Sequence, residues 1–447
     1  MISPYRRSRG KIKNSRHDPR RRFAIINRVS LRLGQASRTK TGRQSLCFTL
    51  LLAWVVQAGD NPARMPLPAN PLQPPAGDSF SFIVYGDIQD NHRNGHDALV
   101  EQMLQEEAAF VLHSGDISED NGEGYGSDFL PVIEPLARRL PFFPAPGNHD
   151  VNWGRPDSRA NFASFFRSAL QFLAGFPQNR HLQALEEQKL WYSFTYGGAL
   201  FIALDSNLFI DEGKYAKTHS LAPYRNMVQQ QLDWLFNLLQ ESEQDPSIRA
   251  KFVYFHHSPI FSHENKPKFG FLGGHPGHRR MMINQVVPGR AASDHRIYLL
   301  DLFRRHRVTA VFSGHVHYYE RWRELVQQGD RFTHLLNFFV LGNGGVKPRG
   351  HPLSKPEDIS RLFEDNPEFQ QYQDRISATD PRLSSQLQHA YPNPEHPDGR
   401  FHGFTLVTVE GDSVRFETKD REGRVRDSGL LADGLDLPPG IRNPRQK

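Results

Sequence analysis

Residues 80–89, FSFIVYGDIQ, form an apolar, β-prone run that stops at Gly86 and Asp87. Four later runs end in the same way, with a break followed by an acidic, amide or imidazole side chain. These are AFVLHSGD at 109–116, FFPAPGNHD at 142–150, FVYFHHSP at 252–259 and VTAVFSGHVH at 308–317. Short continuous apolar runs are typical of strands that are buried on both faces. Because the carboxyl ends of such strands converge on one crevice, we expect their polar side chains to form one site.

The helical signals between these strands complete an α/β pattern. Leu232, Leu235, Phe236 and Leu239 repeat at helical spacing within residues 224–240, and a shorter repeat follows the first predicted strand. Stripes of this kind predict helices that turn an apolar face to the core. We assign them no catalytic role.

Composition limits the kinds of site that the chain can build. The chain has 447 residues, of which 38% are hydrophobic, and one cysteine, Cys47. A single cysteine excludes a disulfide scaffold and a cysteine-based zinc site. Any metal ion must therefore be held by nitrogen and oxygen donors.

The net charge of +6 is distributed unevenly along the chain. Residues 1–44 hold 14 Lys and Arg against one acidic residue, whereas the remainder holds 41 basic and 48 acidic residues. The segment 1–44 is thus a basic leader that we expect to be disordered, and the rest is mildly acidic. A basic arm of this kind could bind nucleic acid through its phosphates. We favour export instead, and expect no nucleic-acid partner for the mature protein.

Export is predicted from the segment 45–58. Its apolar run LCFTLLLAWVV at 46–56 has the length of a signal-peptide core, and Val56-Gln57-Ala58 resembles a cleavage site. We therefore expect a secreted or periplasmic protein with no stable membrane anchor after cleavage. An uncleaved membrane anchor is the alternative. A misassigned start codon would also explain the long leader. Residues 59–79 are rich in proline and predict a linker, and residues 431–447 predict a tail.

The motifs, taken in order, resemble the calcineurin-like metallophosphoesterase superfamily. They are Gly86-Asp87, Gly115-Asp116, Gly147-Asn148-His149-Asp150, His257-Ser258-Pro259 and Gly314-His315-Val316-His317. The last continues as GHVHYYER at 314–321, which is similar to the signature of purple acid phosphatases. The resemblance implies an α/β fold over residues 80–430, a four-layer αββα sandwich of two mixed β-sheets flanked by helices. Residues 346–400 read as a lid or a loop insertion in it.

The resemblance also implies a site for two divalent or mixed-valence metal ions, Mn, Zn or Fe. The first ion would be held by Asp87, Asp116 and His317. The second would be held by Asp116, which bridges, together with Asn148, His257 and His315. Imidazole, amide and carboxylate donors suit these metals.

Two positions depart from the pattern of the family. Gln89 stands where a metal-binding histidine is common, and its side-chain oxygen is a weaker, uncharged ligand. Glu119 stands where purple acid phosphatases have a tyrosine ligand, so we expect neither purple colour nor a tightly held ferric ion.

The remaining candidates surround these ligands. The His-x-Pro pattern selects His257 over His256 as the ligand, which leaves His256 as a supporting or substrate-binding residue. His149 is expected to bind the phosphoryl group or protonate the leaving group, with Asp150 orienting it. His263 is a further candidate for substrate binding.

These residues predict a hydrolase that cleaves phosphate esters by attack of a metal-activated hydroxide at a binuclear centre, as in acid phosphatases. A phosphodiesterase or nucleotidase of the same fold is an alternative. A non-catalytic phosphate-binding relative is another, because Gln89 and Glu119 replace expected ligands.

Overall fold

The computed structural model describes residues 64–68, 72–73, 75, 77, 79–89, 95–152, 155, 157–174, 189–210, 220–261, 295–329, 331–348, 374, 383–390 and 399–432. All of them belong to the second of two compact units, Ala63–Lys447. The basic leader, the apolar segment 45–58 and the residues after 432 lie outside this description, so the leader, export and tail stay predictions.

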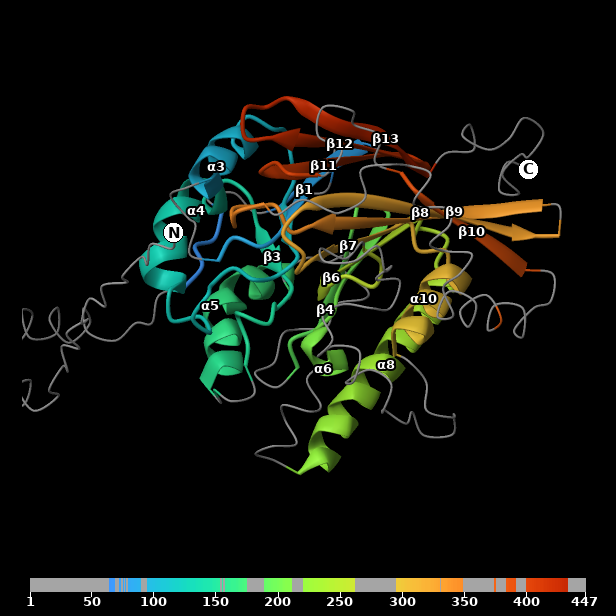
Figure 1. The fold of residues 1–447 in the computed structure, drawn as a ribbon, viewed down its shortest axis with the longest axis horizontal. Coiled ribbons are helices and arrows are strands. Elements are labelled where there is room, and N and C mark those ends of the chain that lie inside the picture. The colour runs from blue at the N-terminus through green and yellow to red at the C-terminus, as the bar shows by residue number, and fades with distance from the viewer. Residues whose placement is uncertain are drawn as a thin grey trace, which may run out of the picture. The chain divides into compact units, whose positions relative to one another are not determined.

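One mixed sheet has six strands in the order β13-β12-β11-β1-β2-β3 (Figure 1). Its strands are β1 (Ser79–Tyr85), β2 (Val111–His113), β3 (Phe142–Pro144), β11 (Gly403–Glu410), β12 (Ser413–Asp420) and β13 (Val425–Ala432). Strands β1, β2 and β3 are parallel, whereas β11 pairs with β1 in the antiparallel sense. The three predicted strands at 80–85, 109–114 and 142–146 are therefore neighbours in this sheet.

The other sheet has seven strands in the order β10-β8-β9-β7-β6-β5-β4. Its strands are β4 (Tyr192–Tyr196), β5 (Ala199–Ala203), β6 (Ala250–His257), β7 (Ala310–Gly314), β8 (Tyr319–Gln328), β9 (Arg331–Leu341) and β10 (Leu383–His389). Strands β5, β6, β7 and β9 are parallel. The predicted strands at 252–255 and 308–313 correspond to β6 and β7.

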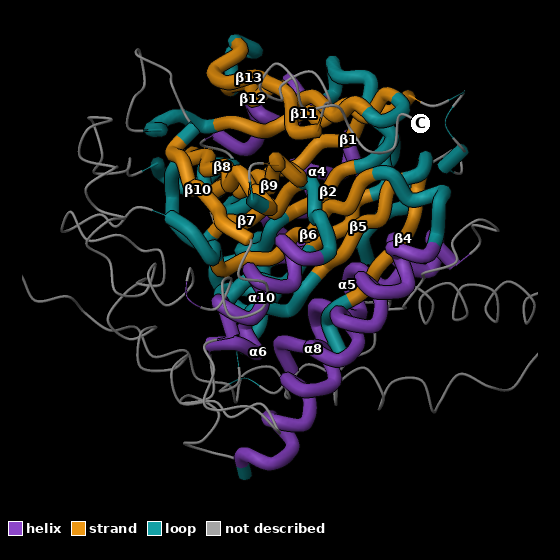
Figure 2. The backbone as a smooth tube through the Cα atoms, turned by 90° about the vertical axis from the view of Figure 1, so that its right-hand side faces the viewer, coloured by secondary structure: helices purple, strands orange, loops and turns teal. Residues whose placement is uncertain are grey.

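The described helices pack against the outer faces of the two sheets. Figure 2 shows several of them on one side of the strands. The described helices are α3 (Asp97–Met103), the π-helix η4 (Tyr125–Phe129), α4 (Leu130–Ala137), α5 (Asp157–Ala174), α6 (Asn207–Ile210), α8 (Leu221–Gln244) and α10 (His295–Arg305). Residues of α3, α4 and α5 share a buried cluster with the six-stranded sheet, and residues of α8 and α10 share one with the seven-stranded sheet. A third cluster, rich in phenylalanine, lies between the sheets. Three apolar interfaces between four layers confirm the predicted αββα sandwich.

The alternation of side chains along the strands explains why the sequence runs that predicted these strands are mostly apolar. In β6, Phe252 and Tyr254 lie in the cluster between the sheets, and Val253 and Phe255 lie in the cluster under the helices. Strand β6 is therefore buried on both faces, and its polar residues lie near its ends.

Two predicted segments contribute more to the domain than their composition indicates. In the predicted linker, Met65 and Leu72 are buried. In the predicted insertion at 346–400, residues 383–389 form the edge strand β10, which pairs with β8. Much of that insertion lies outside the described residues, so its role as a lid stays a prediction.

A partly buried histidine on β9 makes the fold sensitive to acid. Burial, together with the positive charges of Arg307, Arg304 and Lys251, lowers the pKa of His334 to about 3. The unfolded chain, in which this pKa is about 6.5, therefore binds a proton that the folded chain excludes. The stabilisation is complete above pH 6.5 and is lost as the pH falls towards 3. We expect the melting temperature of His334→Gln to fall less than that of the wild type between pH 7 and pH 4.5; equal falls would contradict this assignment.

Candidate metal centre

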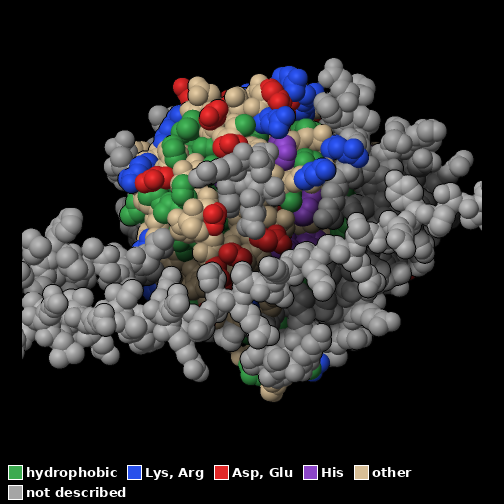
Figure 3. All heavy atoms as spheres, turned by 60° about the vertical axis from the view of Figure 1, so that its left-hand side comes forward, with side chains coloured by type: hydrophobic (Ala, Val, Ile, Leu, Met, Phe, Trp, Pro, Cys, Tyr) green, Lys and Arg blue, Asp and Glu red, His purple; other side chains and the backbone are tan. Residues whose placement is uncertain are grey.

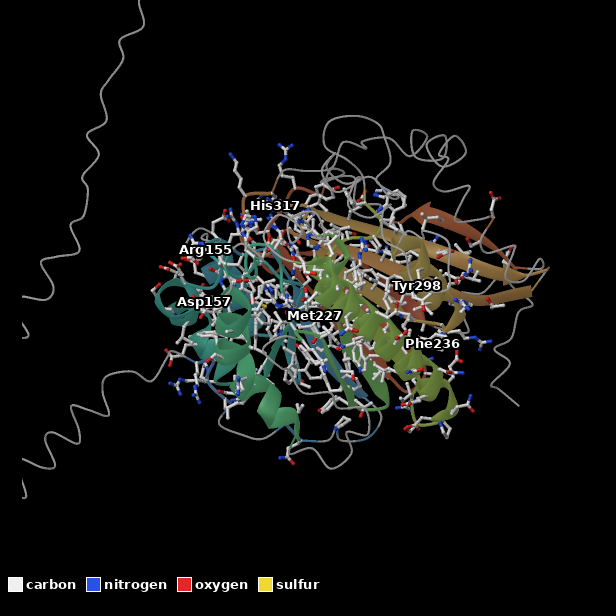
Figure 4. All side chains as sticks on the ribbon, turned by 90° about the horizontal axis from the view of Figure 1, so that it is seen from below. Arg155, Asp157, Met227, Phe236, Tyr298 and His317 are labelled. Carbon is white, nitrogen blue, oxygen red and sulfur yellow. The ribbon has the colours of Figure 1, made fainter. Side chains whose placement is uncertain are left out.

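The ends of five strands, three from one sheet and two from the other, bring the predicted residues together. The loops after β1, β2 and β3 carry Asp87, Asp116 and Asn148. His256 and His257 are the last residues of β6, and the loop after β7 carries His315 and His317. Figure 4 labels His317 in the loop that follows β7. The site thus lies at the shared carboxyl edge of the parallel strands, as the sequence predicts.

Asp87 links the end of β1 to the end of β7. Its Oδ1 and Oδ2 each lie 3.0 Å from the backbone nitrogen of His315, which donates to the carboxylate. His317 places its Nε2 3.7 Å from Asp87 Oδ1. A Cβ atom at Gly314 would lie 2.0 Å from Asp87 Oδ2, so only glycine lets the carboxylate approach the backbone here.

Asp116 lies at the middle of the cluster. Its Oδ2 is 3.1 Å from His256 Nε2, and its Oδ1 accepts a hydrogen bond of 2.9 Å from the His149 backbone nitrogen. The Gln89 side-chain nitrogen lies 3.4 Å from Asp116 Oδ2, so this contact uses the donor end of the amide. Ligation by the Gln89 oxygen stays a prediction.

Asn148 and the histidines complete the opposite side. Asn148 Oδ1 lies 3.1 Å from His256 Nε2 and 3.0 Å from His315 Nδ1. The His257 ring is 4.5 Å from the His315 ring, centroid to centroid, and its Nδ1 lies 2.9 Å from the Ser206 hydroxyl. Both histidines that end β6 therefore face the cluster, although the His-x-Pro pattern selected one.

The donor atoms fit metal ions in type and spacing. In the described part of the chain, two sets of side chains offer atoms within 4.8 Å of one another: His256, His257 and His315, and Asp87, Asp116 and His256. Oxygen and nitrogen donors at such distances suit Mn, Zn or Fe. The residues present therefore fit the metal ions that the sequence predicts.

Electrostatics explain why a cation would be favoured here. Burial raises the pKa of Asp87 well above its usual value. Burial would also raise that of Asp116, but the charges of His256 and His149 lower this pKa below its usual value. Burial lowers the pKa of His256, whereas Asp116 and Asp87 raise it, to about 9 overall. Buried carboxylates of this density are stabilised by positive charge.

The backbone of these loops adopts conformations that side chains disfavour. Asp87, Gln89, Asp116 and His315 have φ angles of 60°, 51°, 56° and 72°. Such left-handed conformations are uncommon outside glycine, and they gather at functional sites, where the surrounding structure holds them in place. Four candidate ligands with this geometry support the assignment of the site.

His149 lies at the accessible side of the cluster, and its side chain is 34% exposed. Its Nδ1 is 3.2 Å from Glu119 Oε1, and its Nε2 is 4.0 Å from Asp116 Oδ2. Glu119 therefore turns the ring so that Nε2 faces the cluster. The sequence marked Glu119 only as a departure from the family pattern and missed this contact.

The expectation that Asp150 orients His149 is corrected by the structure. Asp150 is fully buried, and its carboxylate accepts hydrogen bonds from the backbone nitrogens of residues 116, 117, 118 and 147 and from the Tyr125 hydroxyl. Asp150 thus joins the loop after β2 to the loop after β3. Burial and the charge of Asp116 raise its pKa to about 6.

Removing this carboxylate should loosen the whole site. An unsatisfied buried donor costs about 1–3 kcal/mol, and Asp150→Ala leaves several. We expect its free energy of unfolding to fall by at least about 3 kcal/mol, with loss of bound metal, as measured by urea denaturation and elemental analysis. Asp128→Ala, at an exposed position, is the matched control. A variant at position 150 that is as stable as the wild type would contradict the role.

A sixth strand end was missed from the sequence. Strand β5 ends before Leu204, and the following Ser206 accepts the backbone N–H of His257 at 3.1 Å in addition to its contact with that ring. The run ALFIALDS at 199–206 carries the same signal of an apolar segment followed by polar residues, but it has no glycine. His263 lies outside the described residues.

The comparisons with known proteins assign the family. The calcineurin-like phosphoesterase family matches residues 80–319, more than half of the chain, so the chain belongs to this family. Membership confirms the resemblance that the sequence motifs indicate.

Individual relatives are distant. Human (Homo sapiens) "Acid phosphatase type 7" is 25% identical over 297 residues, 61% of this chain and 56% of that protein. "Probable inactive purple acid phosphatase 9" of Arabidopsis thaliana is 22% identical over 280 residues, 58% of this chain and 37% of that protein. The solved structure of purple acid phosphatase PPD1 from yellow lupin (Lupinus luteus) seeds has a TM-score of 0.46 at 18% identity, covering 83% of this chain and 58% of that chain. The chain spans about half the length of the first of these relatives.

Proposed function

We propose that this protein hydrolyses phosphate esters at a binuclear metal centre, as an acid phosphatase does. The observation that carries the proposal is the position of Asp116, whose carboxylate lies among donors from both sheets. In this proposal Asp87, Asp116 and His317 hold one ion, and Asp116, Asn148, His257 and His315 hold the other. Two bound ions supply an activated water and neutralise the charge of the phosphoryl oxygens.

The side chains around the centre have separate tasks. His149 presents Nε2 to the cluster from its accessible side, where it donates a hydrogen bond to a phosphoryl oxygen or a proton to the leaving group. Glu119 holds the opposite ring nitrogen, Nδ1, and so fixes this orientation. Asp150 keeps the two ligand-bearing loops together.

The face of the molecule drawn in Figure 3 carries histidine side chains with charged side chains of both signs around them, Lys and Arg as well as Asp and Glu.

Hydrolysis of p-nitrophenyl phosphate and of its bis-ester tests the proposal. We expect protein stripped with EDTA to be inactive, and protein reloaded with Mn²⁺ or Zn²⁺ to cleave the monoester. Preference for the bis-ester would indicate the phosphodiesterase alternative. Metal-loaded protein that binds inorganic phosphate and cleaves neither ester would instead be the non-catalytic relative, a second candidate that the replacements at Gln89 and Glu119 permit.

Export also remains a proposal. Within the described part of the chain, no helix combines the length and apolar character needed to cross a membrane. N-terminal sequencing of the protein from its native host tests the predicted cleavage: a mature start near Gly59 is expected, and an intact leader would contradict it.

A further inference from the structure

Strand β6 ends in two adjacent histidines that both face the candidate centre. Side chains of a regular strand alternate between its faces, and Tyr254 points into the core between the sheets, so alternation directs His256 to that side and His257 away from it. The pairing with β7 is irregular at this point: Tyr254 pairs with Phe312, and His257 pairs with Gly314. Two residues of β6, Phe255 and His256, thus lie opposite one residue of β7, Ser313, which is a β-bulge. Bulges re-aim side chains and are common beside active sites.

The bulge brings the two rings to the same edge. The ring centroids of His256 and His257 are 4.9 Å apart, and that of His256 is 5.1 Å from His315. His256 reaches the site by regular alternation, and His257 reaches it through the bulge. Both imidazoles are therefore available to one ion.

His256 Nε2 has the surroundings of a metal ligand. It lies 3.1 Å from Asp116 Oδ2, 3.1 Å from Asn148 Oδ1 and 3.3 Å from His315 Nδ1. Donors bound to one ion at about 2.0–2.2 Å are separated by about 3.0–3.5 Å. The distances from His256 Nε2 to the other three atoms therefore match the separations expected between donors bound to one ion.

The rest of the ring is held in place. His256 Nδ1 lies 3.1 Å from the carbonyl oxygen of Ser114, to which it donates its proton. Metal-binding histidines commonly donate their other ring N–H to such a carbonyl, which leaves the facing nitrogen free to ligate. A Cβ atom at Gly115 would lie 3.0 Å from His256 Cβ, so glycine at 115 permits this close packing.

We propose that His256 is an additional ligand of the second metal ion, through Nε2, so that β6 supplies two histidines to one ion. The inference rests on the proposed binuclear centre. It replaces the supporting or substrate-binding role that the His-x-Pro pattern left for His256. The competing arrangement is an imidazolium that donates hydrogen bonds from Nε2 to Asp116 and Asn148 and touches no ion.

The metal content of variants and the position of the metal ion distinguish ligation by His256 from the competing hydrogen-bonded arrangement. Wild type, His256→Ala and His257→Ala are dialysed against Mn²⁺ and analysed for metal; His306→Ala, which removes a buried histidine outside both donor sets, is the matched control. We expect two ions in the wild type and the control, and a loss of at least about tenfold in affinity for one ion in the other two variants. Unchanged affinity in His256→Ala would overturn the inference.

A crystal structure of the Mn²⁺-loaded wild type, with the ions located by anomalous scattering, is independent of how the variants fold. We expect His256 Nε2 at about 2.0–2.2 Å from one ion. A separation of more than about 3 Å, with Nε2 bonded to Asp116 instead, would refute ligation even if His256→Ala weakened binding. A wild type that binds no metal would refute the binuclear centre itself, which is a different result.

Discussion

Replacing His149 with alanine is expected to lower kcat for p-nitrophenyl phosphate by about 10²–10⁴-fold, the usual contribution of a general acid–base group. The His149 ring makes its contacts with Glu119 and Asp116, and its proposed role is to bind the substrate rather than the metal. Elemental analysis should therefore find the same metal content as in the wild type. Steady-state kinetics on the two proteins at matched metal content measure the effect.

Glu119→Gln provides the comparison for this variant. It keeps an acceptor beside Nδ1 of His149 but removes the charge, so we expect a smaller loss of kcat than for His149→Ala. In the double variant the loss should equal that of His149→Ala alone, because Glu119 acts only through the ring. Full activity in His149→Ala, or additive losses in the double variant, would contradict these roles.

Replacing Asp116 with asparagine is expected to reduce hydrolysis to background and to release bound metal. The change keeps the size of the side chain but removes the charge of a carboxylate that shares a donor set with Asp87 and His256. Without the negative charge of Asp116, less charge would offset the repulsion between the two dications. Metal analysis after dialysis and the rate of ester cleavage measure the result.

Asp233→Asn is the matched control for this variant. Asp233 lies on the exposed face of α8, where it accepts a hydrogen bond of 2.6 Å from Gln229. The Asp233→Asn protein should retain its bound metal and its activity. An Asp116→Asn protein that holds two ions and turns over like the wild type would show that Asp116 is not the bridging ligand.

The sequence predicted the fold because its strands are buried on both faces. A run such as FSFIVY is mostly apolar because it lies between a helix layer and the opposite sheet, as Ile83 and Phe82 show. Polar side chains are then confined to the ends of the strands, where a break in the pattern marks them. Asp87 and Asp116 were found in this way.

What the sequence could not show depends on contacts between loops. Whether Asp150 faces its neighbour His149 or the backbone of the loop after β2 is decided by how the two loops pack. The same holds for Glu119, whose partner lies 30 positions away along the chain. The position of His257 depends on a bulge, and a single extra residue in one strand leaves no mark in the pattern of apolar residues.

Titration of metal-stripped protein with Mn²⁺, followed by the rate of p-nitrophenyl phosphate hydrolysis, tests the account most directly. We predict no activity without metal and a rate that rises until two equivalents are bound, with the ions lost in Asp116→Asn. Full activity in the stripped protein, or a protein that binds no Mn²⁺, would contradict the binuclear centre.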